Sequence, residues 1–407
     1  MGRLFGTDGV RGIANTELTA QLAFNLGQAG AKVLTKTLSH KPTILVGKDT
    51  RISGDMLEAA LAAGICSVGA KVVGLGVVPT PAVAHLVRAY GADAGVVISA
   101  SHNPFDYNGI KFFDSQGYKL SDEIEDEIEA LISENCDIPN LPVGAQIGRY
   151  EQNIDAVSDY IQFIKSVSPI TLEGLNVVLD CANGASYKCA PEVLNQLGAK
   201  TTVIHNTPDG SNINANCGST HMQCLSDAVT STKADIGIAF DGDADRMLAV
   251  DENGDKVSGD EIMLICAKAL KDSGKLKNDT VVATVMSNLG FFIAAKNNQI
   301  NACQTKVGDR YVLEEMRQGG YTLGGEESGH IIFLDHNTTG DGLLSAVMLL
   351  GVMKMSGKKL SELRKIMNVL PQVLINAKVS NSNKYTYDQN PIIAKRIEEL
   401  ESGFSGS

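Results

Sequence analysis

Residues 234–246 read ADIGIAFDGDADR, an apolar run of strand length that passes directly into a loop with three carboxylates. Five similar β-branched runs occur along the chain: TILVGKD, KVVGLGVV, AGVVIS, NVVLD and TVVATV. Helix-like patterns separate several of them, among others at residues 54–64, 187–197 and 260–271. Strand–helix alternation of this kind is typical of α/β domains with parallel or mixed sheets.

A chain of 407 residues is too long for one hydrophobic core. Pro- and Gly-rich stretches or turns near residues 136–150, 251–255 and 368–371 suggest the boundaries. We expect three consecutive α/β domains with mixed sheets around a shared cleft, followed by an incomplete C-terminal α+β domain. Their predicted ranges are 1–150, 151–253, 254–368 and 369–407. In the last range we expect one strand at 371–379 and one helix at 391–400.

The composition limits the classes of function and location. Lys and Arg number 35 against 47 Asp and Glu, and the net charge of −12 argues against nucleic acid or an anionic membrane as a partner. No apolar run reaches the roughly 20 residues of a membrane span, and the first residues lack the apolar core of a signal peptide. Eight cysteines without a C-x-x-C pair suit reduced thiols. We expect a cytoplasmic protein.

One cysteine grouping could bind zinc. Cys217, His221 and Cys224 would supply three ligands, but no fourth ligand with the spacing of a metal site follows. The sequence therefore favours buried or loop thiols at these positions.

Glycine-rich polar stretches follow several of the predicted strands. They read VGKDTRISG, ISASHNP, LDCANG, AFDGDADR and LGGEESGH. Ligands of open α/β sheets bind beyond the carboxyl ends of the strands, so these loops are expected to share one cleft.

The loop DGDADR is the strongest chemical signal. Asp241, Asp243 and Asp245 repel one another unless a hard divalent cation binds them, and Arg246 beside them could contact a phosphate. An EF-hand calcium loop is disfavoured, because its sixth position needs glycine where Arg246 stands and because MLAV follows as a predicted strand. A solvated acidic turn remains the plain alternative.

Ser101 in SASHNP has three interpretations. A hydrolase nucleophile would need a G-x-S-x-G elbow, which is absent, and the neighbouring His102 should point away from the serine on an extended segment. A plain turn residue would need no partners. A phosphate carrier would need a metal and cationic groups, and only this interpretation links Ser101 to the aspartate loop.

Further polar residues could complete such a site. Glu326 and Ser328 in GGEESGH suit hydrogen bonds to sugar hydroxyls, and His330 could exchange a proton. Candidate phosphate-binding cations stand beside glycine-rich turns: Arg11, Arg51, Lys111, Lys306 and Arg310. Neither a P-loop nor a dinucleotide-binding glycine motif occurs.

Together, four motifs in this order resemble the α-D-phosphohexomutases: FGTDGVRG, SASHNP, DGDADR and GGEESGH. The resemblance extends from residue 3 to about residue 380. Residues 212–221 and 338–345 look like the branch of this family that acts on glucosamine phosphate.

The resemblance implies a mechanism. Ser101 would carry a phosphoryl group, and Mg²⁺ would be held by Asp241, Asp243, Asp245 and an oxygen of the phosphoserine. Lys111 matches the family's general acid/base. The remaining matches are residues around the transferring phosphoryl or the sugar, namely Arg11, Arg246, Lys306, His102, Glu326, Ser328 and His330.

The implied reaction interconverts glucosamine 6-phosphate and glucosamine 1-phosphate through a 1,6-bisphosphate, for UDP-N-acetylglucosamine and cell-wall precursors. The alternatives are a phosphoglucomutase or phosphomannomutase with the same mechanism, or a non-catalytic sugar-phosphate-binding homologue. The partner would be a small sugar phosphate, and a homodimer is expected from relatives. The family's C-terminal phosphate loop, R-x-S-G-T-x-P, does not occur in these residues, so we expect a truncated fourth domain.

Overall fold

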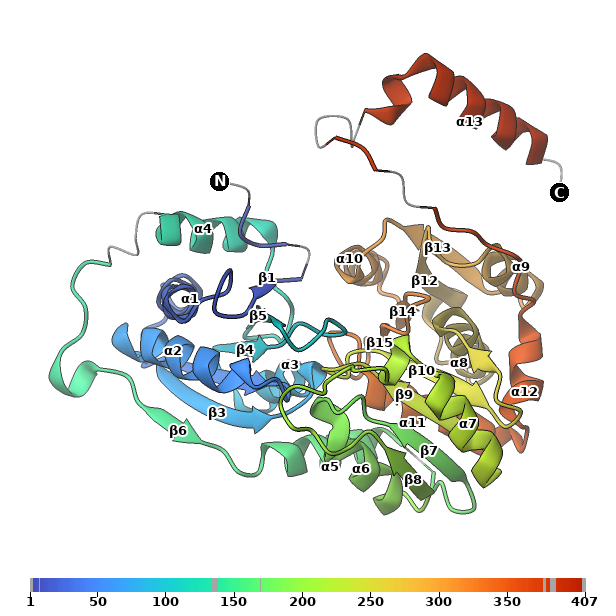
Figure 1. The fold of residues 1–407 in the computed structure, drawn as a ribbon, viewed down its shortest axis with the longest axis horizontal. Coiled ribbons are helices and arrows are strands. Elements are labelled where there is room, and N and C mark those ends of the chain that lie inside the picture. Colours follow the sequence, from blue (N-terminus) through green and yellow to red (C-terminus); the bar gives the residue numbers. More distant parts are fainter. Residues whose placement is uncertain are drawn as a thin grey trace. The chain divides into compact units, whose positions relative to one another are not determined.

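The computed structural model describes residues 3–6, 8–133, 138–168, 170–375, 378–380 and 386–404. The chain divides into two compact units, Met1–Val369 and Leu370–Ser407. Within the described residues, the strands of the first unit form three mixed sheets, and helices pack on both faces of each (Figure 1). No helix in this part of the chain combines the length and the apolar character that crossing a membrane requires.

The first sheet has six strands in the order β1-β5-β4-β2-β3-β6. β2 pairs in parallel with β3 and β4, whereas β5 runs antiparallel to both β4 and β1. Its elements are β1 (Val10–Ile13), α1 (Ala20–Leu34), β2 (Thr43–Lys48), α2 (Ser53–Ser67), β3 (Lys71–Val77), α3 (Thr80–Tyr90), β4 (Ala94–Ile98), β5 (Tyr107–Asp114), α4 (Asp122–Ser133), η1 (Gly144–Gln146) and β6 (Tyr150–Gln152).

The second sheet has five strands in the order β11-β10-β9-β7-β8. β7 is parallel to β8 and β9, and β10 returns antiparallel to β9. Its elements are α5 (Ala156–Val167), β7 (Asn176–Asp180), η2 (Ala185–Tyr187), α6 (Cys189–Gln196), β8 (Lys200–Ile204), η3 (Gly218–Thr220), α7 (Gln223–Thr232), β9 (Ile236–Phe240), β10 (Met247–Asp251) and β11 (Lys256–Val257).

The third sheet has four strands in the order β13-β12-β14-β15, of which only the β14–β15 pair is antiparallel. Its elements are α8 (Gly259–Asp272), η4 (Lys277–Asp279), β12 (Thr280–Thr284), α9 (Leu289–Asn297), β13 (Asn301–Thr305), α10 (Asp309–Gly319), β14 (Leu323–Gly325), β15 (Ile331–Phe333), α11 (Gly342–Ser356), α12 (Leu360–Leu363) and η5 (Arg364–Ile366).

Alternation along the strands explains the helix layers. Successive strand side chains point to opposite faces, so Leu45 and Val46 of β2 enter different clusters. Val46 packs with α1, α2 and α4, whereas Leu45 packs with α3 in a core that continues through the other two sheets. This shared core reaches Leu179 of β7 and Val281 of β12, and it ties the three sheets into the first unit.

The predicted α/β class with mixed sheets is confirmed. The exact domain boundaries stay predictions. In the second unit, the described part contains η7 (Tyr387–Gln389) and α13 (Pro391–Phe404), which covers the predicted helix at 391–400. The strand expected at 371–379 is wrong for residues 371–375 and 378–379, which carry no strand, whereas 376 and 377 lie outside the described residues. A strand forms only where a neighbouring strand pairs with it, and these residues have no such ladder.

Candidate functional site

Ser101 lies in the loop that follows β4, and it contacts the aspartate loop directly. Its backbone is left-handed, with a φ of +52°, and its side chain is buried. Ser101 Oγ donates a hydrogen bond of 2.6 Å to Asp241 Oδ2, across 140 positions of sequence. The predicted link between the serine loop and the aspartate loop is therefore a direct contact.

The loop around Ser101 is held in place by Arg51. The Arg51 side chain is buried, and its Nη2 donates to the carbonyls of Ser101 and Asn103, each at 2.9 Å. Its Nη1 bonds the carbonyls of Pro104 and Tyr107, and its Nε bonds Asp49 at 2.8 Å. Because main-chain oxygens and Asp49 occupy the whole guanidinium, Arg51 positions the serine loop and is not the phosphate-binding cation that the sequence suggested.

The three aspartates come together as predicted. One carboxylate oxygen from each of Asp241, Asp243 and Asp245 lies within 4.8 Å of the others, and all three residues are buried. Asp243 Oδ2 accepts from Thr80 Oγ1 at 2.6 Å and from Lys111 Nζ at 2.8 Å. The other oxygens, Asp243 Oδ1 and Asp245 Oδ1, are buried without a hydrogen-bond partner.

Unpartnered buried carboxylate oxygens this close together fit a hard divalent cation, since such ions prefer several oxygen ligands. Burial, followed by the charges of Asp245 and Asp243, raises the pKa of Asp241 well above its ordinary value. A cation among the three would reverse that effect. The EF-hand alternative is excluded, because Met247–Asp251 form β10 and Glu252 bonds Ser361 Oγ at 2.5 Å.

A line of alternating charges extends from the aspartates. Lys111 on β5 is buried, and its Nζ lies 2.8 Å from Asp243 Oδ2 and 3.0 Å from Asp8 Oδ2. Lys119 Nζ then lies 2.5 Å from both Asp8 Oδ1 and Asp309 Oδ2. Burial alone would lower the pKa of Lys111, but Asp243 and Asp8 outweigh it and raise the pKa, so the ammonium form persists at neutral pH.

His330 lies at the other side of Asp245. The ring is buried, Nδ1 lies 3.6 Å from Asp245 Oδ2, and Nε2 accepts the Gly340 N–H at 3.1 Å. Although burial pushes the pKa of Asp245 upward, His330 and Lys111 hold it below its ordinary value. His330 thus contacts the site through Asp245, and its catalytic role stays a prediction.

His102 lies beside Ser101, and Arg246 lies beside His102. His102 Nδ1 is 3.4 Å from Ser101 Oγ and 3.5 Å from Arg246 Nη1. Partial burial, then the charges of Arg246 and Arg11, lower the pKa of His102. We expected the His102 side chain to point away from Ser101, but the two side chains lie next to each other. The reason is that the left-handed backbone at Ser101 breaks the extended geometry, in which neighbouring side chains point apart.

The remaining predicted residues have contacts of their own, and their roles at the site stay predictions. Arg11 pairs with Asp8, and its Nε is buried without a hydrogen-bond partner. Glu326 Oε1 accepts the Gly308 N–H at 3.1 Å, Ser328 Oγ is buried without a partner, and Lys306 is exposed, with Nζ 5.7 Å from the centre of the Tyr311 ring. Arg310 bonds Asp122 and the Leu120 carbonyl.

Sequence reasoning missed several residues of the site. Asn214 Nδ2 donates to the carbonyls of Ser101 and Asn103 at 2.9 and 3.0 Å, and Thr80 bonds Asp243. Asp8, Lys119 and Asp309 supply the alternating charges. Asn214 lies in the stretch 212–221 and Asp8 in FGTDGVRG, so both stand in motifs that the sequence did single out.

Comparison with known proteins agrees with this geometry. Models of phosphoglucomutase/phosphomannomutase alpha/beta/alpha domains I, II and III match residues 2–137, 158–254 and 258–370. A phosphoglucosamine mutase of Ruminiclostridium cellulolyticum is 64% identical over 408 residues, which cover 100% of this chain and 90% of the relative.

Two solved structures extend the comparison. A phosphoglucomutase/phosphomannomutase family protein from Burkholderia thailandensis is 26% identical with a TM-score of 0.78, over 90% of this chain and 80% of that one. An Aspergillus fumigatus N-acetylphosphoglucosamine mutase in complex with GlcNAc-6P and magnesium has a TM-score of 0.67 at 17% identity, over 98% and 88% of the two chains, and shares the fold. The chain that carries these converging loops belongs to the phosphoglucomutase/phosphomannomutase family.

Proposed function

We propose that this chain catalyses the phosphoglucosamine mutase reaction, the interconversion of glucosamine 6-phosphate and glucosamine 1-phosphate. The observation that carries the proposal is the 2.6 Å hydrogen bond from Ser101 Oγ to the buried aspartate loop. The relative that is 64% identical along the whole chain supports the choice of sugar.

In this proposal Ser101 is phosphorylated at the start of the cycle. The sugar O1 attacks the phosphorus and gives up its proton, the bond from phosphorus to Ser101 Oγ breaks as that oxygen takes up a proton, and a 1,6-bisphosphate forms. After the bisphosphate turns round, Ser101 Oγ attacks the 6-phosphoryl group and glucosamine 1-phosphate leaves. Ser101 needs no strong base in its resting state, because it begins each cycle as the phosphate donor.

Asp241, Asp243, Asp245 and the phosphoserine are the residues that would hold Mg²⁺. When bound, the ion supplies positive charge that screens the phosphoryl group. The buried oxygens Asp243 Oδ1 and Asp245 Oδ1, which lack hydrogen-bond partners, fit this role.

The other predicted site residues have different roles in this proposal. His102, which contacts Ser101, and Arg246, which contacts His102, would orient the phosphoryl oxygens. Lys111 stays protonated because of Asp243 and Asp8, so it can donate a proton or stabilise developing charge. Arg11 and the exposed Lys306 would bind the phosphate, and Glu326 and Ser328 the sugar hydroxyls.

The test is to measure the phosphate on Ser101 and turnover together. Intact mass and peptide mapping of the full-length enzyme should find one phosphate on Ser101, and Ser101→Ala should lose both the phosphate and mutase activity. Ser231→Ala, on the exposed side of α7, is the matched control and should keep both. Full activity in Ser101→Ala would exclude the phosphoserine mechanism.

A panel of substrates tests the sugar. Rates on the 6-phosphates of glucosamine, glucose and mannose should favour glucosamine, and a clear preference for glucose 6-phosphate would reassign the chain to the phosphoglucomutases. Ligand-induced thermal stabilisation without turnover would favour a binding protein. The expected homodimer and cytoplasmic location stay predictions, which light scattering and cell fractionation would test.

A further inference from the structure

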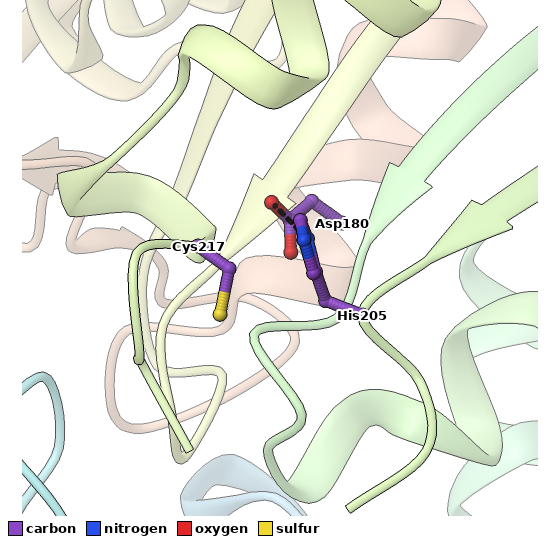
Figure 2. Close-up of side chains that lie close together, drawn as sticks. All are labelled: Asp180, His205 and Cys217. Atoms are coloured by element: carbon purple, nitrogen blue, oxygen red, sulfur yellow. Dashed lines mark ion pairs between the residues drawn. The ribbon is translucent and has the colours of Figure 1, made fainter. Parts of the chain in front are cut away.

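A second group of metal-ligating side chains lies in the second sheet. Asp180 ends β7, His205 directly follows β8, and Cys217 directly precedes η3. One ligand atom from each lies within 4.8 Å of the other two. Figure 2 shows the three side chains close together on three separate segments, with the ion pair between Asp180 and His205 marked. None of the three has a role in the proposed mutase reaction.

The sequence pointed to a different trio. It grouped Cys217 with His221 and Cys224, but His221 is exposed and its Nδ1 bonds Thr220 Oγ1 at 3.1 Å, while Cys224 is also exposed. The fold instead brings Asp180 and His205 to Cys217 from distant parts of the chain.

His205 is oriented toward the other two by a constrained backbone. Its φ of +49° is left-handed, which is uncommon for a residue with a side chain. Nδ1 is buried 3.0 Å from Asp180 Oδ2, yet it makes an ion-pair contact without hydrogen-bond geometry. Asp180 is its charge partner here, and a metal ion would bind between the two in place of this direct contact.

Asp180 is held by the backbone of both neighbouring loops. Its Oδ1 accepts the Ala182 N–H and its Oδ2 accepts the Gly218 N–H, each at 2.9 Å. Carboxylate oxygens have further lone pairs, so these bonds fix the carboxylate and leave it able to bind a cation. Asp180 is thus a rigid ligand, and His205 and Cys217 are the two that would adjust.

We propose that Asp180, His205 and Cys217 form a binding site for a zinc-type transition-metal ion, separate from the aspartate cluster beside Ser101. Imidazole and thiolate ligands favour Zn²⁺ or Co²⁺ over Mg²⁺, which prefers oxygen. Three protein ligands leave a fourth position for water.

The distances between the three ligand atoms are compatible with this ion after small adjustments of the side chains. Tetrahedral zinc with these ligand types places its donors about 3.3–3.7 Å apart. The three ligand atoms lie within 4.8 Å of one another, and His205 Nδ1 lies 3.0 Å from Asp180 Oδ2, so small rotations of the His205 and Cys217 side chains would be needed to bring all separations into this range. The His205 side chain is 28% exposed, which gives the ion a route from solvent.

A metal ion bound here would stabilise the segment 205–217, which contacts the serine loop. Asn214, which lies between His205 and Cys217 in sequence, donates to the Ser101 carbonyl at 2.9 Å. Its own N–H bonds the Ala182 carbonyl at 2.9 Å, two residues from Asp180. An ion that joins both ends of this loop to β7 would therefore stabilise the position of Asn214.

The binding step releases a proton. Burial, followed by Asp180, raises the pKa of Cys217 to about 12, so the free thiol is protonated at neutral pH. The S–H bond breaks as the metal–sulfur bond forms, and the proton passes to the buffer.

Co²⁺ is the probe, because a cobalt–thiolate bond gives a charge-transfer absorption band. The full-length, metal-stripped protein is titrated in excess Mg²⁺, which keeps Co²⁺ away from the aspartate cluster. The wild type should develop the thiolate band up to one equivalent, and added Zn²⁺ should remove it. The measurement needs no mutase activity, so it stands or falls independently of the proposed function.

Four variants locate the ligands. Cys217→Ser should abolish the band, and His205→Ala should weaken Co²⁺ binding more than about tenfold. The controls Cys224→Ser and His221→Ala should bind as the wild type does, which separates this trio from the one suggested by the sequence. Circular dichroism of the metal-free variants verifies folding, and partly exposed His205 tolerates replacement even if Cys217 does not.

The contrary results are equally specific. Absence of a thiolate band in the wild type, or a band that survives Cys217→Ser, would overturn the site. A band lost in Cys224→Ser but kept in His205→Ala would also overturn it. Asp180 and His205 would then be a structural ion pair beside a buried thiol.

Discussion

Gly242 shows how closely the serine loop and the aspartate loop approach each other. A Cβ added at Gly242 would lie 2.5 Å from the Ser101 carbonyl oxygen and 2.8 Å from Asn214 Nδ2. Both contacts are far below van der Waals distance, and the carbonyl belongs to the main chain. Any side chain here must displace the serine loop from Asp241 or Asn214.

We expect Gly242→Ala to reduce kcat/KM for glucosamine 6-phosphate by about 100-fold, because a displacement of about 1 Å in a catalytic group costs about that much. Steady-state kinetics and a thermal melt measure the effect. Gly351→Ala in α11 is the control, since a Cβ there meets open space and should leave kcat/KM unchanged. Wild-type kcat/KM in Gly242→Ala would contradict this account of the loop contact.

Among single residues, the sequence predicted those whose chemistry depends on near neighbours in the chain. Asp241, Asp243 and Asp245 stand within five positions, and their mutual repulsion is evident without a fold. Thr80 and Asn214 could not be predicted in the same way, because each acts through one contact with a distant loop. Arg51 was misjudged for the same reason: its carbonyl partners exist only once the serine loop is folded.

Helices α3 and α5 meet through a stacked pair of rings. His85 on α3 and Phe163 on α5 have ring centroids 3.7 Å apart and planes inclined by 16°. Burial, then the charge of Arg88, lowers the pKa of His85 to about 4. The folded protein therefore holds a neutral imidazole between these helices.

This pair makes stability depend on pH. The pKa of His85 is lowered on folding, so its contribution is complete above the unfolded value near 6.5 and is lost as pH falls through about 4. His85→Gln cannot acquire the charge and should show a smaller fall in melting temperature between pH 7 and pH 4.5. Thermal melts across this range test it, with exposed His221→Gln as the control. Equal falls in wild type and His85→Gln would refute the assignment.

At the scale of elements, β-branched runs bounded by glycine predicted strands well. TILVGKD, NVVLD and TVVATV contain β2, β7 and β12, which lie inside their sheets with partners on both sides. The alternating run at 371–379 has the same local preference but carries no strand in its described part. Strand propensity mainly reflects packing against neighbours, which a local pattern does not contain.

The first unit is joined across its sheets by charged side chains. Lys119 precedes α4 of the first sheet and contacts Asp309 at the start of α10, as well as Asp8. Its side chain is 15% exposed, so both ion pairs are largely desolvated. Similarly, Tyr160 of α5 donates to Asp341, the N-cap of α11, at 2.7 Å.

Lys119→Met should destabilise the protein by about 3 kcal/mol, because the largely desolvated carboxylate of Asp309, which is 17% exposed, loses that cation, and Asp8 loses one of its cationic partners. Urea unfolding gives the free energy of unfolding. The control is Lys36→Met, which removes an exposed pair with Glu127, with side chains 53% and 45% exposed, and should cost under about 1 kcal/mol. Equal costs in the two variants would show that Lys119 does not join the sheets.

For the molecule as a whole, the order of the motifs predicted that the loops converge. It did not predict the contacts that hold the three sheets together. The residues of the loop motifs differ from the residues that join the sheets. Each loop motif carries its chemistry in adjacent residues. The contacts that join the sheets, from Lys119 to Asp309 and from Tyr160 to Asp341, span 190 and 181 positions of sequence. Their partners cannot be identified before the sheets are placed, since ordinary helix and strand positions contain the same residue types.

Arg51 has a consequence for the reaction cycle. In the proposed mechanism, the bisphosphate turns round once in every cycle, so the space beside Ser101 is emptied and refilled each time. With all of its guanidinium nitrogens bonded to Asp49 or to main-chain carbonyls, Arg51 holds the serine loop through contacts within the chain that need no ligand. The conformational entropy of that loop is therefore lost once, during folding, and the sugar phosphate need not order it again at each turnover.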